Sequence, residues 1–164
     1  MLRRLGASEE DMLVIQTNLA CTYYRLGRRR EALRIERDVY SGYLKSYGEE
    51  HERTLVAAIN FTTSLIYQNR FEEAKSLLLK TIPVARRVLG ESHGLTLKMR
   101  ANYAEALYTD PDSTLDNLRE SVTTLAEIEP IARRVLGDAH PTTTDVEGNL
   151  LDARIALRAR WGAV

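Results

Sequence analysis

The three histidines of this chain have the residue type that binds metal ions or exchanges protons near neutral pH. They are His51, His93 and His140, and each stands three residues after a glycine that belongs to an internal repeat. Equivalent positions of successive repeats lie about one repeat apart, which is too far for bonds of about 2 Å to one zinc ion. We therefore expect no metal site and no cofactor, and we assign the histidines a structural role at the junctions between repeats.

Other side chains that could carry catalysis stand alone or in a setting typical of surface charge. Cys21 is the only cysteine, and no histidine lies near it in the sequence to activate its thiol. The carboxylate pairs Glu49-Glu50 and Glu72-Glu73 are typical of a solvated surface. No glycine-rich phosphate loop, nucleophile elbow or metal-ligand spacing is present. These patterns favour a protein that is not an enzyme.

A basic cluster near the start of the chain permits two interpretations. It comprises Arg28, Arg29, Arg30, Arg34 and Arg37. The cluster indicates either a binding site for an acidic partner or a helix face exposed to solvent. Glu31 and Glu36 stand among these arginines and favour the solvated face.

Charge and composition exclude several classes of protein. The 23 basic and 23 acidic side chains give a formal charge of zero, which argues against a nucleic-acid-binding protein. The longest apolar run, residues 55–59, is far shorter than the roughly 20 residues of a membrane-spanning helix. A single cysteine permits no internal disulfide, and residues 1–6 do not resemble a signal peptide. We expect a soluble cytoplasmic protein without nucleic-acid or membrane partners.

Two sets of landmarks recur along the chain with the same spacing of 42, 42 and 47 residues. The first set is the glycines Gly6, Gly48, Gly90 and Gly137. The second set is the asparagines Asn18, Asn60, Asn102 and Asn149. Because both sets keep one register, the chain is built from internal repeats.

Each repeat contains two apolar stripes with helical spacing. In the second repeat, the first stripe consists of Ala58, Phe61, Thr62 and Leu65, and a similar stripe starts at Ala74. Gly27 and Asn69 break the two stripes at equivalent positions, and both residue types tolerate the left-handed backbone that ends a helix. No strand pattern is present. The sequence predicts an all-α solenoid of antiparallel helix pairs, with seven main helices and a helix content above roughly two thirds.

The third repeat is five residues longer than the others. We expect the additional residues in its turn, around Pro111, or in a lengthened second helix. Ser113, with Asp116 three residues later, predicts the start of that second helix. Pro83 and Pro130 lie inside second helices, which should bend or split there.

The landmarks also divide the chain as a single array. The predicted units are repeat 1 at about 11–50, repeat 2 at about 51–92, repeat 3 at about 93–139 and a terminal helix at about 140–161. Residues 1–6 match the tail of a preceding repeat, so we expect a window of a longer solenoid or poorly capped ends. Trp161 either covers an exposed apolar end, or that end stacks on another chain.

The motifs of the turns and junctions resemble the tetratricopeptide repeats of kinesin light chains. The resemblance rests on the 42-residue period, an Asn-Leu-Ala in the first helix, and the segments Gly27-Arg28-Arg29-Arg30-Glu31-Ala32, Asn69-Arg70-Phe71-Glu72-Glu73-Ala74 and Gly137-Asp138-Ala139-His140-Pro141-Thr142. It covers nearly the whole chain. The resemblance implies a right-handed superhelix whose concave surface, lined by the first helices, holds a peptide segment of a partner protein.

The resemblance also implies which residues face the peptide. They are Val14, Asn18, Cys21 and Arg25; Val56, Asn60, Thr63 and Tyr67; Lys98, Asn102, Glu105 and Thr109; and, in the last helix, Asn149. A carboxamide can donate and accept, so each repeat asparagine bonds either a ligand backbone or the neighbouring repeat. Leu19, Ala20 and Tyr23 fall on the opposite side, where we expect them to pack against the second helix.

We therefore expect a non-enzymatic adaptor that binds peptide segments of other proteins. Kinesin light chains favour peptides with a tryptophan flanked by acidic residues, but here only Arg25 and Lys98 are basic along the stripe, and Glu105 opposes them. The sequence thus does not favour a strongly acidic peptide. The alternatives are a structural solenoid that self-associates through its ends, forming a homo-oligomer, and a regulatory domain of a larger protein.

Overall fold

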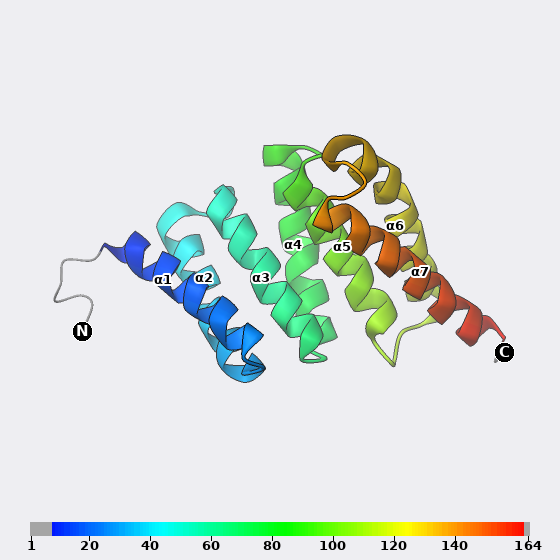
Figure 1. Cartoon of the computed structure of the whole chain (residues 1–164), viewed down its shortest axis with the longest axis horizontal. Helices are drawn as coiled ribbons and strands as arrows, with labels where there is room; N and C mark the ends of the chain where they lie inside the picture. The colour runs from blue at the N-terminus through cyan, green and yellow to red at the C-terminus, as the bar shows by residue number, and fades with distance from the viewer. Residues whose placement is uncertain (1–7, 163–164) are drawn as a thin grey trace.

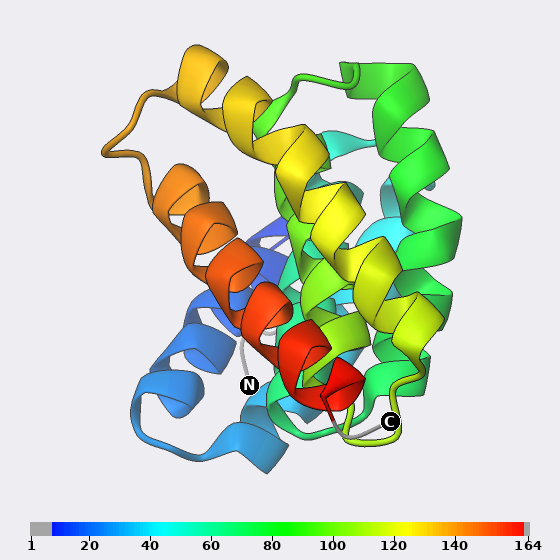
Figure 2. The same ribbon diagram turned by 90° about the vertical axis from the view of Figure 1, so that its right-hand side faces the viewer.

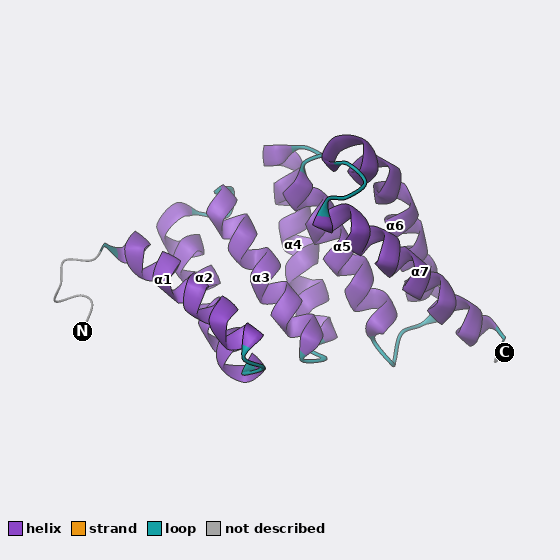
Figure 3. Ribbon diagram, in the orientation of Figure 1, coloured by secondary structure: helices purple, strands orange, loops and turns teal. Residues whose placement is uncertain are grey.

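The computed structural model describes residues 8–162 and contains seven α-helices in this part of the chain (Figures 1 and 3). They are α1 (Glu9–Arg25), α2 (Arg29–Tyr47), α3 (Glu52–Tyr67), α4 (Phe71–Leu89), α5 (Gly94–Thr109), α6 (Leu115–Leu136) and α7 (Pro141–Trp161). Helices account for 84 % of the described residues, which include no strand. The predicted all-α solenoid with seven helices is therefore confirmed.

The helices form two layers. The first helices α3, α5 and α7 lie beside one another in chain order, and each second helix packs between the first helices that precede and follow it. Figure 2 views this stack from the end formed by α6 and α7. α1 packs mainly on α2 and makes little contact with α3, so the layer of first helices is open between α1 and α3. No described helix is long and apolar enough to cross a membrane.

The turns follow from residues that accept a positive φ. Gly27 has φ of 73° and Asn69 has φ of 58°, and each follows the last turn of a first helix as predicted. The three glycines that end the second helices have φ between 83° and 95°, a region that side chains with a Cβ avoid. These local requirements fix the repeat period, because they determine where each helix ends.

The three histidines cap the helices that follow them. In each case the imidazole Nδ1 accepts a hydrogen bond from the backbone N–H two residues later, at 3.1 to 3.3 Å. His51 caps α3, His93 caps α5 and His140 caps α7. This arrangement confirms the structural role predicted at the junctions, because each cap satisfies one of the free N–H groups at a helix start.

Replacing His93 with Ala is expected to lower the free energy of unfolding by about 1 kcal/mol, the usual cost of losing an N-cap. The Leu95 N–H, 3.3 Å from the imidazole, loses its acceptor in this variant. His93→Asn should restore most of the loss, since a carboxamide oxygen also accepts from this N–H. Urea unfolding of the three proteins measures the difference, and equal stabilities would show that the cap contributes nothing.

The five additional residues of the third repeat are divided between its turn and its second helix. The turn 110–114 has two residues more than the turns 26–28 and 68–70, and α6 has three residues more than α2 and α4. The prediction that Ser113 starts the helix is wrong. Thr114 is the N-cap, and its hydroxyl accepts from the Asn117 N–H at 3.2 Å, while Ser113 is buried.

Neither helix proline splits its helix. α4 continues through Pro83 and α6 continues through Pro130. Both prolines lie on exposed faces, as do the residues four positions earlier, Leu79 and Ala126. In each helix the carbonyl that lacks an N–H partner because of the proline therefore faces solvent. The free-energy cost of a proline inside the helix is lower here than it would be in a buried position.

The core consists of small and branched side chains on the facing stripes of the helices. Its largest cluster joins α5, α6 and α7 around the fully buried Leu97 and Leu125. Ala20 is buried as predicted, but the prediction that Leu19 packs against the second helix is wrong, because Leu19 is 41 % exposed. At the equivalent position of α3, Phe61 stacks on Tyr40 of the preceding second helix, and no such helix precedes α1 among the described residues.

The predicted tail of a preceding repeat, residues 1–6, lies outside the described residues. The division into repeat units stays a prediction. At the other end, Trp161 is exposed and lies beside Arg119 of α6, whose guanidinium carbon is 5.1 Å from the ring centroid. Leu151 and Ile155 of α7 remain 60 % and 56 % exposed, so Trp161 does not cover this apolar face.

Candidate functional site

Two adjoining hollows lie along the opening between α1 and α3. The larger, of about 470 Å³, is called here the Val56 hollow, and its lining comprises Val14, Thr17, Tyr43, His51, Glu52, Arg53, Val56, Ala57 and Asn60. The smaller, of about 330 Å³, is called the Glu36 hollow, and its lining comprises Cys21, Tyr24, Arg25, Glu36, Ile59, Asn60, Thr63, Ser64 and Lys98. Asn60 lines both, so the two hollows meet at this residue, and together they are called the groove.

Most of the residues predicted to face a peptide line this groove. Val14 and Val56 lie in the Val56 hollow, and Cys21, Arg25, Thr63 and Lys98 lie in the Glu36 hollow. Asn18 is exposed on α1 outside both linings, as is Thr109 on α5. Tyr67 is exposed at the end of α3, with its ring centroid 5.5 Å from that of Tyr24. The structure thus brings the stripes of α1 and α3 together across the opening.

The repeat asparagines differ in their surroundings. Asn102 is 2 % exposed, and its Nδ2 donates to the Thr63 hydroxyl on α3 at 2.9 Å. The Asn149 Oδ1 accepts from the Tyr108 hydroxyl on α5 at 3.1 Å. Both therefore link neighbouring repeats, which is the second of the two roles considered for them. Asn60 is half-buried in the groove and has no side-chain hydrogen bond to another described residue.

The charges on α5 largely face α7. The Lys98 Nζ donates to Asp145 Oδ2 at 2.6 Å, so an acidic partner already compensates this lysine. Burial raises the pKa of Glu105 above its ordinary value, and the nearby Lys98 offsets only part of that effect. Arg25, the other basic side chain of the predicted stripe, forms no ion pair within the described part of the chain. This balance agrees with a groove that is not strongly basic.

Glu36 is the residue of the groove that sequence reasoning misplaced. The arginines of the basic cluster are exposed, as expected, but Glu36 is 9 % exposed and its Oε2 has no hydrogen-bond partner. Burial raises the pKa of Glu36 to about 7, and the nearby Ser64 hydroxyl offsets only part of this effect. The prediction that Glu36 belongs to a solvated face is therefore wrong.

A comparison between repeats would have revealed the burial of Glu36. It stands twelve residues before Gly48, and the residues twelve before Gly90 and Gly137 are Leu78 and Leu125. Both leucines are fully buried. A carboxyl group thus occupies a core position of the repeat.

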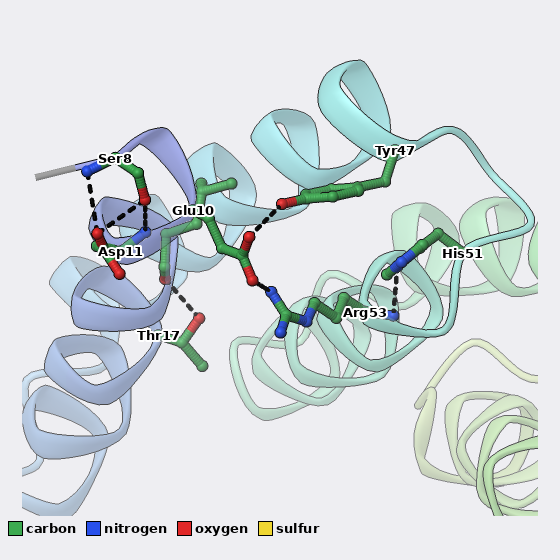
Figure 4. Close-up of polar contacts among 8 residues, drawn as sticks. Ser8, Glu10, Asp11, Thr17, Tyr47, His51 and Arg53 are labelled. Atoms are coloured by element: carbon green, nitrogen blue, oxygen red, sulfur yellow. Dashed lines mark hydrogen bonds and ion pairs between the residues drawn. The ribbon is translucent and has the colours of Figure 1, made fainter.

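Polar contacts link α1, α2 and α3 at the Val56 hollow, which Arg53 lines (Figure 4). Glu10 of α1 accepts from the Tyr47 hydroxyl of α2 at 3.0 Å and forms an ion pair with Arg53 of α3. The hydrogen bonds from Arg53 and Tyr47 lower the pKa of the Glu10 carboxyl. All three side chains are exposed, so the cluster orients α1 while contributing little to overall stability.

The groove contains no arrangement that indicates catalysis. No group of three or more His, Cys, Asp or Glu side chains in residues 8–162 is placed to hold a metal ion. Cys21 is exposed, and the three histidines serve as helix caps. What the arrangement offers is a shallow apolar channel with isolated hydrogen-bonding groups, which suits an extended chain.

Stacked antiparallel helix pairs with a groove along the first helices define an α-solenoid repeat protein. Residues 11–86 match the family model described as tetratricopeptide repeat. This match spans less than half of the chain and agrees with the resemblance that its motifs predicted. No curated protein matches the sequence.

Solved structures extend the likeness to nearly the whole chain. The nearly identical TPR-like repeats assigned to a kinesin light chain of Podosopora anserina match with a TM-score of 0.73 for one variant, at 23 % identity over 96 % of this chain and 72 % of that chain. A second structure of these repeats gives a TM-score of 0.70 with the same identity and coverage. BtubC (BKLC) from P. vanneervenii gives 0.60 at 15 % identity over 94 % and 66 %. At these identities the likeness establishes the fold.

Proposed function

We propose that this chain is a non-enzymatic adaptor that binds an extended peptide segment of a partner protein in the groove between α1 and α3. Tetratricopeptide folds are generally protein-interaction scaffolds and are typically non-catalytic. The observation that carries the proposal is the pair of hollows that Asn60 joins. An extended peptide buries apolar side chains in such hollows and bonds its backbone to the groups between them.

Asn60 has the chemistry to bond the backbone of that peptide. Its carboxamide can donate and accept, and no other described side chain bonds it. Glu10 contacts Tyr47 and Arg53 beside the Val56 hollow, and we place one end of the peptide there. The bound segment would therefore run along α1 and α3 toward Arg25 and Tyr67.

Replacing Asn60 with Ala is expected to weaken peptide binding by up to about tenfold, the loss of one hydrogen bond of about 0.5–1.5 kcal/mol. The free energy of unfolding should change by less than about 0.5 kcal/mol, since Asn60 forms no internal side-chain bond. Fluorescence polarisation with a peptide selected from a random-sequence library measures the affinity.

Asn102→Ala is the matched control, because the same residue type there bonds Thr63 inside the fold. It should destabilise the protein by about 1–3 kcal/mol, the cost of losing a buried bond. If Asn60→Ala instead destabilises the protein and leaves affinity unchanged, Asn60 is a structural residue and the proposed groove contact is wrong.

Self-association through α7 is a second candidate, favoured by its exposed Leu151 and Ile155. Such a face is typical of a helix that packs against another one. Sedimentation over a dilution series separates the candidates, since a monomer at all concentrations disfavours stacking. A role as the regulatory domain of a larger protein is compatible with either.

A further inference from the structure

The Glu36 hollow combines apolar walls with one carboxyl group. α1 contributes Cys21 and Tyr24 to the walls, and α3 contributes Ile59, Thr63 and Ser64. Glu36, from α2, is more than nine-tenths buried, and its Oε2 has no partner. At the same position of the other repeats the chain has leucine, so the fold itself does not require a carboxyl group here.

No positive charge compensates Glu36 within the described residues. None of the ion pairs formed there includes it, and Lys98, which also lines the hollow, is paired with Asp145 at 2.6 Å. Arg25 is exposed to solvent, which screens its charge. A buried carboxyl without a partner is costly, and removing a cation from water is equally costly unless the two meet.

We propose that the Glu36 hollow is the anchor subsite of the groove and takes a lysine or arginine side chain of the bound peptide. This inference rests on the proposed function, since it assumes that a peptide occupies the groove. The methylene stem of the basic side chain would lie against Ile59 and Tyr24, and its N–H donors would reach the carboxyl group of Glu36, which lines the hollow. A hollow of about 330 Å³ has room for one such side chain.

A basic side chain suits the Glu36 hollow better than an apolar side chain does. An apolar side chain would displace water from the hollow and leave the Glu36 carboxyl without a partner of opposite charge. A basic side chain supplies the donors and the opposite charge together, and a charged hydrogen bond in a poorly solvated site is among the stronger ones.

The occupant also makes binding dependent on pH. A cation binds the ionised carboxylate, and the pKa of Glu36 in the free protein is about 7, so affinity should rise from pH 6 to pH 8 by about tenfold. The other titratable groups of the hollow are Cys21, Tyr24, Arg25 and Lys98. Burial raises the pKa of Tyr24 to about 12, so it stays neutral in this range. The variant Cys21→Ser removes the thiol as an alternative source of the effect.

The test starts from random heptapeptides selected on the whole chain, followed by fluorescence polarisation of the best binder. We expect lysine or arginine at one aligned position. Replacing that residue with norleucine, which removes the charge and keeps the stem, should weaken binding to the wild type at least tenfold at pH 8. With Glu36→Gln the same replacement should change affinity less than threefold, and the pH dependence should disappear.

Glu31→Gln is the matched control, since Glu31 lies on the same helix but is exposed and paired with Arg28. It should behave as the wild type does, and circular dichroism should show the same helix content for all variants. Bound peptides without a common basic residue, or an equal norleucine effect on wild type and Glu36→Gln, overturn the anchor subsite and leave the proposed function in place. If no peptide is selected, both the subsite and the proposed function fail.

Discussion

Leu97→Ala is expected to lower the free energy of unfolding by about 2–5 kcal/mol, the range for a buried leucine truncated in a core that cannot collapse fully. Leu97 is fully buried in the cluster that joins α5, α6 and α7. A cavity at this point removes contacts from three helices at once, so the loss should lie in the upper part of the range. Chemical denaturation with far-ultraviolet circular dichroism measures it.

Leu19→Ala is the control for this prediction, because the same substitution occurs on an exposed helix face. Its effect should stay within about 0.5 kcal/mol. A cost at Leu19 equal to that at Leu97 would mean that another surface covers α1 in solution. The comparison thus separates burial within this chain from burial against a second molecule.

The stability of the wild type is expected to fall between pH 5 and pH 8 by about 2 kcal/mol more than that of Glu36→Gln. Burial raises the pKa of Glu36 from 4.5 to about 7, so the folded state holds this proton more tightly than the unfolded chain does. The neutral carboxyl therefore contributes stability that is fully present below pH 4.5 and is lost as the pH rises through about 7. Glutamine is neutral throughout and removes this dependence.

Urea unfolding of both proteins at pH 5 and pH 8 measures the difference, and the other titrating groups cancel because the two chains share them. Glu31→Gln should follow the wild type over this range, since Glu31 is exposed. Parallel loss of stability in the wild type and Glu36→Gln would show that water reaches the carboxyl in solution. The Glu36 hollow would then lose the feature that distinguishes it.

The repeat register and the helix boundaries could be predicted from the sequence because they depend on local chemistry. Gly27 and Asn69 end helices through their own backbone preferences, and His93 caps α5 through a bond to a residue two positions away. Such features recur wherever the residue recurs. The seven helices and their pairing follow directly.

The direction in which individual side chains face could be predicted only in part, because it depends on neighbours far along the chain. Asn60 and Asn102 hold the same repeat position, yet α5 packs closely on α3 while α1 stands away from it, so one asparagine is accessible and the other buried. The residue type of Glu36 alone predicts a surface position, whereas the structure buries it. The leucines at the equivalent positions of the other repeats are buried, and they indicate that this position belongs to the core.

The opening between α1 and α3 also sets the order in which the chain comes apart. In a stack of repeats, stability is the sum of each unit and its contacts with its neighbours. α5 is held by α3, α4, α6 and α7, whereas α1 is held mainly by α2. Among the described helices α1 has the fewest neighbours, so we expect it to detach with the smallest local free energy, and it carries one wall of the groove. A ligand that bridges α1 and α3 would hold this helix in place. Ligand binding in the groove and the attachment of α1 are therefore coupled, and each stabilises the other.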